Sequence, residues 1–297
     1  MPRKFKEQFK DFLFVVPALA YAIIFAYYPL VKLFDLSFTN WNLLRDSYKY
    51  VGTKNYEWLF YGTGAKYIRN SIQVTVIYAV AETAITIIGG MLLALLLKKT
   101  SKYFKVLKAF AFLPRYISIS TAGVVFLWML NTNSGILNRI IMQYGGEKID
   151  WLGKPGTALL SIIMLAGWKN VGYGMMIYLS AMPNIPREYY EAAAIDGATN
   201  TKSFFKITLP LLAPTTYFLF ITSLLASLKA FQSIDIMTQG GPIRSTEVYV
   251  YLIYHMSMEQ FRVDRASAAA VVFFVALLLL TIVLQTISKK VSKNSVL

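Results

Sequence analysis

Long apolar runs alternate with shorter polar segments along this chain of 297 residues. A helix rises by roughly 1.5 Å per residue, so an apolar run of about 20 residues can cross a hydrocarbon layer of about 30 Å. Six runs reach that length, which predicts an all-α membrane protein with six transmembrane helices. The expected helices are residues 12–34, 71–97, 106–130, 157–181, 211–233 and 266–288.

The first apolar run has a second interpretation, as a secretory signal. Basic residues crowd segment 1–11 ahead of it, and Ala18-Leu19-Ala20 resembles a cleavage site. However, the apolar stretch continues through Tyr27–Leu30, well past the roughly 7 to 15 residues of a signal core. We therefore expect this run to be retained as the first transmembrane helix.

The composition agrees with a lipid environment, because 56% of the residues are apolar and 15% are charged, against about a quarter charged in soluble proteins. Lys and Arg number 30 against 15 acids, a net charge of +15. Such an excess suits nucleic acid or an anionic surface, and in a membrane protein it orients the helices and meets anionic headgroups. With no Cys and a single His, His255, we expect no metal site, no bound cofactor and no nucleic-acid partner.

The polar segments form two alternating sets, one with 15 Lys and Arg in 60 residues and the other with 11 in 94. Because cytoplasmic segments carry the denser basic charge, we expect the first set and both chain termini to face the cytoplasm. The first set is 1–11, 98–108, 182–210 and the basic tail 289–297, and the second is 35–70, 131–156 and 234–265.

Segment 182–210 contains the residues of a helix, a turn and a second helix. Three consecutive alanines are strong helix formers, and Gly197 can end their helix by taking a positive φ. Thr199 or Thr201 can cap a second helix that stops near Pro210. The simplest alternative is an amphipathic connector on the membrane surface. A smooth surface of small side chains instead favours close approach by another protein.

The motif within this segment is more specific than its helix signals. Glu191-Ala192-Ala193, three residues, Gly197, nine residues and then Ile207-Thr208-Leu209-Pro210 resembles the EAA motif of permease subunits in binding-protein-dependent ABC importers. That family carries the motif on the cytoplasmic side between the fourth and fifth spans, which is where it lies here.

Matches outside the motif resemble the carbohydrate-uptake branch of that family, the relatives of the maltose and glycerol-phosphate permeases. The resemblance extends from about Phe12 to Gln285. The larger maltose-type subunit has additional helices and a large periplasmic insertion that are absent here, so the layout is closer to the lactose, raffinose or glycerol-phosphate type. The matching residues are Phe38-Thr39, Val51-Gly52, Asn55-Tyr56, Leu113-Pro114, Trp128, Gly135, Asn138, Trp168, Gly172 and Gly240-Gly241-Pro242.

The resemblance implies the type I ABC importer permease fold, with a cytoplasmic coupling helix docked in a groove of an ATPase subunit. Glu191 would contact the ATPase, Ala192 and Ala193 would pack in the groove, and Asp196 would order the turn. The residues expected to couple to the ATPase are Glu188, Glu191, Ala192, Ala193, Asp196, Gly197, Ile207, Leu209 and Pro210.

The ATP site is expected on another polypeptide, because no Gly-x-x-x-x-Gly-Lys-Ser/Thr sequence occurs in this chain. The chain would then be a non-catalytic permease, with ATP and Mg on the partner ATPase. The resemblance also implies a second homologous permease, giving a heterodimer, two ATPase subunits and an extracytoplasmic solute-binding protein. The location would be a bacterial or archaeal cell membrane.

Ionisable residues within the predicted spans point to a polar pathway, because charges in lipid usually face a cavity or a partner. Glu82 and Lys169 fall at similar depth near the midplane, and we expect them to pair or to line one pathway. A structural ion pair or a contact with the partner permease is the alternative. Arg115, inside the third span, either snorkels or faces the pathway. The substrate-pathway candidates are Tyr78, Glu82, Arg115, Trp168, Lys169, Asn170, Tyr173, Gln232 and Asp235.

Two other classes of function compete with the importer. An autonomous secondary transporter or a channel for a polar solute would need no ATPase, but no internal inverted repeat with matched broken helices is evident. A membrane enzyme would need a catalytic metal cluster or a nucleophile motif, and the sequence has neither. The resemblance implies a carrier of sugars or oligosaccharides, and the residues do not select one sugar, since all hydroxyl-rich ligands use the same aromatic and amide chemistry.

Overall fold

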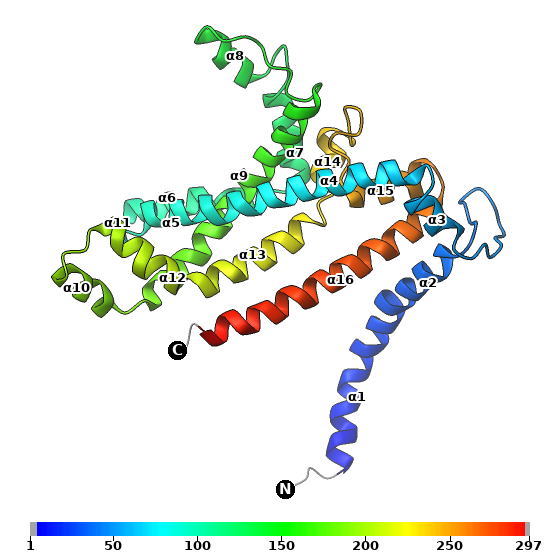
Figure 1. Ribbon diagram of the computed structural model, residues 1–297, viewed down its shortest axis with the longest axis horizontal. Coiled ribbons are helices and arrows are strands. Elements are labelled where there is room, and N and C mark those ends of the chain that lie inside the picture. Colours follow the sequence, from blue (N-terminus) through cyan, green and yellow to red (C-terminus); the bar gives the residue numbers. More distant parts are fainter. Residues whose placement is uncertain (1–4, 295–297) are drawn as a thin grey trace. The chain divides into compact units, whose positions relative to one another are not determined.

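The computed structural model describes the backbone of residues 5–294 and the side chains of residues 10–288 (Figure 1). The side chains of the basic tail 289–297 and of most of segment 1–11 therefore lie outside the described residues. Within 5–294 the regular structure is helical, and one isolated antiparallel bridge joins Thr39 and Tyr50. The all-α prediction is confirmed for this part of the chain.

The chain divides into two compact units, one of residues up to 68 with 252–276, the other of residues 69–251 with 277–297. In the first unit, α1 (Phe5–Ala22), η1 (Ile23–Tyr27) and α2 (Tyr28–Ser37) form one continuous helix. It is followed by α3 (Lys54–Phe60), and the unit also contains η6 (His255–Glu259) and the first part of α16 (Val263–Asn294).

Buried polar groups organise the loop of the first unit. The Asn55 side chain donates hydrogen bonds to the carbonyls of Ser37 (2.8 Å) and Thr39 (2.7 Å), which joins α3 to the end of α2. Asp264 is buried beside Arg262, with 2.7 Å between carboxylate and guanidinium. These bonds give buried polar groups the partners that their burial requires.

The second unit is a helical bundle around one long helix, α9 (Pro155–Ala181). Helices α5 and α6 lie along α9, and α7, α13 and α14 also pack against it (Figure 1). The remaining helices of this unit are α4 (Gly64–Ala84, which begins in the first unit), η2 (Ile85–Gly89), α5 (Gly90–Leu97), α6 (Lys102–Phe112), η3 (Leu113–Tyr116), α7 (Ile119–Met129), α8 (Ile136–Gln143), η4 (Met182–Asn184), α10 (Arg187–Ile195), α11 (Asn200–Ser203), η5 (Phe204–Thr208), α12 (Leu209–Leu211), α13 (Ala213–Ser227), α14 (Gln232–Met237) and α15 (Tyr249–Tyr254, which ends in the first unit).

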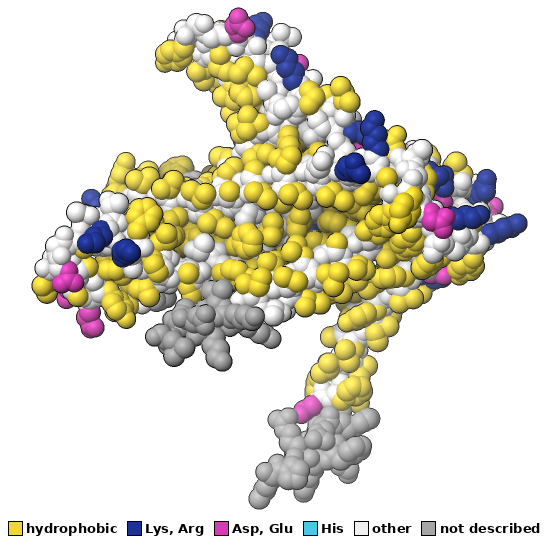
Figure 2. Space-filling model, in the orientation of Figure 1, with side chains coloured by type: hydrophobic (Ala, Val, Ile, Leu, Met, Phe, Trp, Pro, Cys, Tyr) yellow, Lys and Arg dark blue, Asp and Glu magenta, His cyan; other side chains and the backbone are white. Residues whose placement is uncertain are grey.

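Among the described residues, three helices are long and apolar enough to cross a membrane, or up to five if two bent pairs each count as one span. The three are Lys10–Ser37, Gly64–Leu97 and Val263–Ser288. Helix α9 is 27 residues long but is not among them, because Lys169 and Asn170 interrupt its apolar sequence. Figure 2 shows hydrophobic side chains covering the visible sides of the long helices.

The structure divides two of the expected spans. In the region expected to be a helix over 106–130, the chain bends by 99° between Tyr116 and Ile119. In the region expected over 211–233, it bends by 62° at Leu212, and α13 ends at Ser227. Both bends lie beside prolines, Pro114 and Pro210, whose rings lack the N–H that continues a helical ladder.

Glycines on α9 let neighbouring backbones come close. A Cβ atom on Gly172 would lie 2.1 Å from the Ala111 carbonyl oxygen, and one on Gly174 would lie 2.1 Å from the Thr86 carbonyl oxygen. Lipid tails are as apolar as the side chains of these helices, so tight packing has to supply much of the attraction between them. The small residues therefore allow the contacts that hold α6 and η2 to α9.

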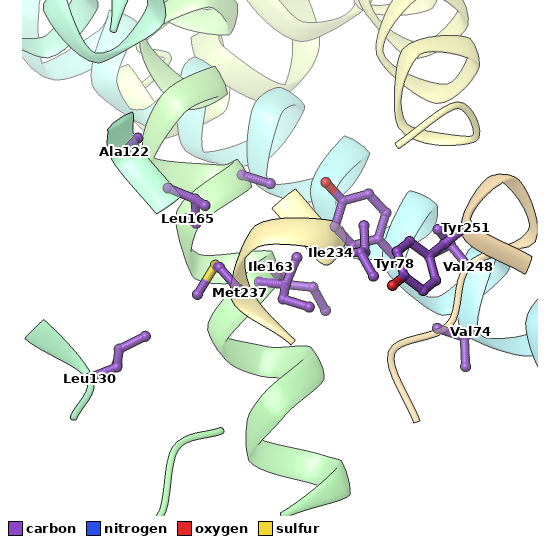
Figure 3. Close-up of a cluster of buried hydrophobic side chains, with 12 residues drawn as sticks. Val74, Tyr78, Ala122, Leu130, Ile163, Leu165, Ile234, Met237, Val248 and Tyr251 are labelled. Atoms are coloured by element: carbon purple, nitrogen blue, oxygen red, sulfur yellow. The ribbon is translucent and has the colours of Figure 1, made fainter. Parts of the chain in front are cut away.

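A cluster of buried hydrophobic side chains lies on the N-terminal half of α9 (Figure 3). Ile163 and Leu165 of α9 belong to it, together with Ala122 of α7 and Ile234 and Met237 of α14. The cluster also takes in side chains of α4 and α15, so it joins segments that are far apart in the sequence. It holds α7, beyond the 99° bend, against the central helix.

We predict that Gly174→Ala destabilises the protein, because the added methyl group would collide with a backbone atom that cannot rotate away. Overpacking of this kind costs about 1–3 kcal/mol. The thermal unfolding temperature of the detergent-solubilised protein should fall. Gly156→Ala is the matched control, since nothing lies within 4 Å of the Cβ position there. Equal unfolding temperatures for the two variants would contradict the close approach.

Candidate functional site

The predicted helix, turn and helix of segment 182–210 is confirmed in outline. Helix α10 ends at Ile195, and Gly197 has a φ of +73°. The Ala198 N–H donates to the Ala193 carbonyl (2.8 Å), and the Gly197 N–H donates to the Ala194 carbonyl (3.1 Å). This pair of bonds is the glycine-ended helix terminus that the sequence predicts.

The second helix of the segment begins at Thr199, whose hydroxyl accepts a hydrogen bond from the Lys202 N–H (3.3 Å). It continues through α11, η5 and α12 to Leu211, one residue beyond the predicted stop. Of the two threonines that the sequence offered as caps, Thr199 takes the role.

Helix α10 leaves its surface uncovered, since it has no buried residue. Tyr189 is 53% exposed and Ile195 is 87% exposed, and the Glu188, Glu191 and Ala192 side chains are exposed between them. Figure 2 shows charged side chains of both signs at the end of the bundle where α10 lies. A short helix with exposed apolar, small and acidic side chains is a surface on which another protein can dock.

The exposed helix is nevertheless anchored to the bundle. Ile185, just before α10, is buried in a cluster with Met175 and Tyr178 of α9. Tyr190 of α10 shares a hydrogen bond of 2.8 Å with the Thr208 hydroxyl. A displacement of α10 would therefore be transmitted both to α9 and to the helix that leads into α13.

The last three predicted coupling residues divide between two environments. Ile207 packs against the cluster that contains Ile185. Leu209 and Pro210 line an open apolar groove of about 480 Å³ with residues of α13. Ile207 therefore supports the segment from inside, whereas Leu209 and Pro210 are accessible.

A polar centre lies at the 99° bend, where carbonyl oxygens of the broken helix lie within reach of α9. Lys169 of α9 is 9% exposed, and its Nζ atom donates hydrogen bonds to the carbonyls of Pro114 (3.1 Å) and Ile117. Of the two arrangements expected for Glu82 and Lys169, a pair or a shared pathway, the structure does not form the pair. The lysine bonds to the backbone instead, because the bend places the Pro114 carbonyl, which also accepts the Ile117 N–H (3.3 Å), and the Ile117 carbonyl within its reach.

The next residue of α9, Asn170, connects the two remaining charges. Its amide Nδ2 donates to the Glu82 carboxylate, and its Oδ1 accepts from the Arg115 guanidinium. Glu82 is 6% exposed. The guanidinium carbon of Arg115 lies 4.9 Å from the centroid of the Tyr173 ring, a favourable position of a cation over an aromatic face. One amide thus joins α4, η3 and α9.

These groups line a cavity of about 140 Å³. Sequence analysis missed three of its hydroxyl-bearing residues, Thr86, Thr222 and Ser223. Thr86 could have been found, since it lies four residues after Glu82 and therefore on the same helix face. Thr222 and Ser223 come from α13, and no sequence signal pairs that helix with α4.

The other candidates lie outside this cavity. Tyr78 is buried against Glu82, and the Trp168 ring packs 5.6 Å from that of Phe126. Gln232 and Asp235 are on α14, which packs against α7 and α9. The nine candidates therefore do not form one site, and Glu82, Arg115, Asn170 and Tyr173 are the ones that line the cavity together. Within the described residues, no group of three or more His, Asp or Glu side chains could hold a metal ion.

Known proteins are similar to this chain over most of its length. The sequence model of the family described as "Binding-protein-dependent transport system inner membrane component" matches residues 86–293. The probable ABC transporter permease protein YurN of Bacillus subtilis (strain 168) is 31% identical over 275 residues, covering 91% of this chain and 93% of YurN. The sn-glycerol-3-phosphate transport system permease protein UgpA of Escherichia coli (strain UTI89 / UPEC) is 27% identical over 282 residues, covering 94% of each chain.

A solved structure has the same fold. It is a chain of a bacterial alginate ABC transporter in complex with an alginate pentasaccharide-bound periplasmic protein. The TM-score is 0.84 at 24% sequence identity, and the match covers 98% of this chain and 99% of that one. The predicted fold class is therefore confirmed, and the count of six membrane spans stays a prediction.

We predict that Asn170→Ala lowers the unfolding temperature, because the buried Glu82 carboxylate would lose a donor. An unsatisfied buried acceptor costs about 1–3 kcal/mol, and more when it is charged. Adding Glu82→Gln should restore part of the loss, since a neutral amide costs less to leave unpaired. Asn133→Ala, at an exposed position, is the control. Strictly additive effects of the two substitutions would contradict the bridge.

Proposed function

The chain belongs to the family of binding-protein-dependent transport system inner membrane components, and on that premise we propose that it is the permease subunit of an ATP-driven importer of a sugar or oligosaccharide. Alternating access of the bundle would move the solute inward. The observation that carries the proposal is α10, an uncovered helix anchored to the central helix of the bundle. An autonomous transporter or channel has no use for such a surface.

Helix α10 is the coupling helix of this proposal. Its exposed Glu188, Tyr189 and Glu191 would contact a separate ATPase subunit, and its small Ala192 and Ala193 would enter the groove of that subunit. The turn at Asp196 and Gly197 holds the helix in its docking orientation. The anchor through Ile185 and Tyr190 supports transmission in both directions, because ATPase movement would shift α9 and α13 together.

The partners follow from the family. We infer two ATPase subunits that bind ATP and Mg, a second homologous permease in a heterodimer, and an extracytoplasmic solute-binding protein. One supporting relative is the alginate transporter, whose structure includes a periplasmic binding protein. The denser basic charge of segments such as 98–108 and 182–210 supports cytoplasmic placement of α10 and of both termini in a bacterial or archaeal membrane.

The small cavity supports a shared solute path. Its volume of about 140 Å³ is below the roughly 300–1,000 Å³ of ordinary ligand sites. We infer that Arg115, Asn170 and Tyr173 form one wall of the path and that the second permease completes it. A guanidinium, an amide and an aromatic face bind hydroxyl-rich rings well. Tyr78, Glu82 and Lys169 hold this wall in place.

The remaining candidates are Trp168, Gln232 and Asp235, which do not line the small cavity. Trp168 is 40% exposed, so its face is open to a solute or to the partner permease. Gln232 and Asp235 lie where α14 follows the end of α13, and they would meet the solute only if the path also runs past α14. The relatives with printed substrates carry sn-glycerol-3-phosphate or alginate, which supports a hydroxyl-rich solute as the class.

We predict that Glu191→Lys and Gly197→Asp each weaken association with the ATPase subunits and reduce uptake. The first reverses a charge on the docking face, and the second places a charged side chain at a φ of +73°, a conformation that glycine adopts without steric cost. Co-purification of the ATPase and uptake in proteoliposomes measure the two effects. Glu147→Lys, the same charge change in the loop 131–156, should leave both unchanged. Normal association of the ATPase with both coupling variants would refute the docking assignment.

We predict that Arg115→Ala reduces uptake at least tenfold while the ATPase still co-purifies, because the change removes a charged group from the path wall and leaves α10 intact. A tenfold loss corresponds to about 1.4 kcal/mol. Uptake should be measured with the complete transporter in proteoliposomes. Tyr116→Ala, at the neighbouring exposed position, is the control and should keep most of the uptake. Equal uptake by the two variants would remove Arg115 from the path.

A further inference from the structure

A second and larger cavity lies behind the coupling helix and has no role in the solute path. Its volume is about 680 Å³, and it opens between the end of α5, the η4 turn, α10 and the helix of α11 and η5. All of these segments belong to the second unit of the chain. None of its lining residues lines the small cavity at Arg115.

Four polar side chains that line this cavity lack partners within the described part of the protein. Among the described residues, the side chains of Lys98, Asn200, Thr201 and Ser203 make no hydrogen bond or ion pair, although all four line the space. No carboxylate lines it. The cavity therefore offers one ammonium group, an amide and two hydroxyls to an anion.

The position of the cavity selects the kind of anion. Lys98 directly follows Gly64–Leu97, a helix long and apolar enough to cross a membrane, so a span formed by this helix would end at Lys98. The other walls include the apolar side chains of Leu95, Met182 and Phe204. A soluble phosphate ion would leave these walls uncovered and would fill little of a space in which a water molecule needs only about 30 Å³. A phospholipid covers them with its glycerol and acyl carbons.

The surrounding charge favours an anionic lipid over a neutral one. Lys99, Lys102 and Lys105 follow Lys98 within one short segment, and all three side chains are exposed. Basic residues at a cytoplasmic membrane surface attract anionic lipids by about 1 kcal/mol each. This attraction raises the local concentration of such lipids at the mouth of the cavity.

We propose that this cavity is a binding site for the phosphodiester headgroup of an anionic phospholipid, with Lys98 as the counter-charge and Asn200, Thr201 and Ser203 as hydrogen-bond donors. The site adjoins the coupling helix directly, because Tyr190 and Thr208, which share a hydrogen bond, both line it. A bound lipid would fill the space between α5 and α10 and brace the coupling helix against the bundle.

Native mass spectrometry of the full-length chain tests the site, with phosphatidylglycerol or phosphatidylcholine added to the detergent-solubilised protein. We expect a retained phosphatidylglycerol adduct that Lys98→Gln weakens about fivefold, the effect of one basic group. Ser203→Leu, which fills the cavity without changing charge, should also weaken it. Lys105→Gln is the matched control, because it removes the same charge from an exposed position outside the cavity, and the adduct should weaken less than in Lys98→Gln.

Four results would overturn the proposal. They are equal retention of the two lipids, equal losses in Lys98→Gln and Lys105→Gln, displacement of the lipid by soluble glycerol phosphate, and loss of the adduct when the ATPase subunits assemble on the chain. The third would assign the cavity to a soluble phosphate ester. The fourth would assign it to the protein interface.

Discussion

The structure depends on one constraint, that backbone polar groups inside a membrane must find partners within the protein. The chain breaks a helix at Pro114 to Ser118, inside an apolar region that is long enough to be a span. Lys169 of α9 supplies partners there by donating to the Pro114 and Ile117 carbonyls. Burial of an ammonium group costs free energy unless the group is well paired. The carbonyls at the bend therefore stabilise Lys169, and Lys169 stabilises the bend.

The same turn of α9 also carries the polar chemistry. Asn170 follows Lys169 and bridges Glu82 to Arg115, and Gly172 and Gly174 then let α6 and η2 come close enough to make these bonds. At roughly 1.5 Å per residue, Asn170 lies about 18 Å along the axis from Met182, where the coupling segment begins. Helix α9 therefore joins the polar wall to the η4 turn and Ile185, which lead into α10, the proposed docking surface.

The structure of segment 182–210 was predictable because it is local. Gly197 takes a positive φ and Thr199 caps the next helix whatever surrounds them, since both effects arise from neighbours within four residues. The polar centre was not predictable to the same degree. Glu82 and Lys169 stand at similar depth on two predicted spans, and depth alone indicated that they pair or line one pathway. The bend at Pro114 changed the outcome, because it created backbone acceptors that attract Lys169 and left Glu82 to the amide of Asn170.

The sequence by itself determined the helical membrane class, the family resemblance and the helix-turn-helix of segment 182–210. These features depend on the hydrophobic pattern, the motif spacing and the local backbone preferences, all of which can be read from the sequence. The tertiary structure decided which polar groups meet. Thr86, Thr222 and Ser223 join the wall at Arg115, and Lys98 joins Asn200 at the larger cavity. Each of these sets combines helices distant in the sequence, and the packing that brings them together follows from backbone approach at a few glycines and from two bends whose angles no local pattern specifies.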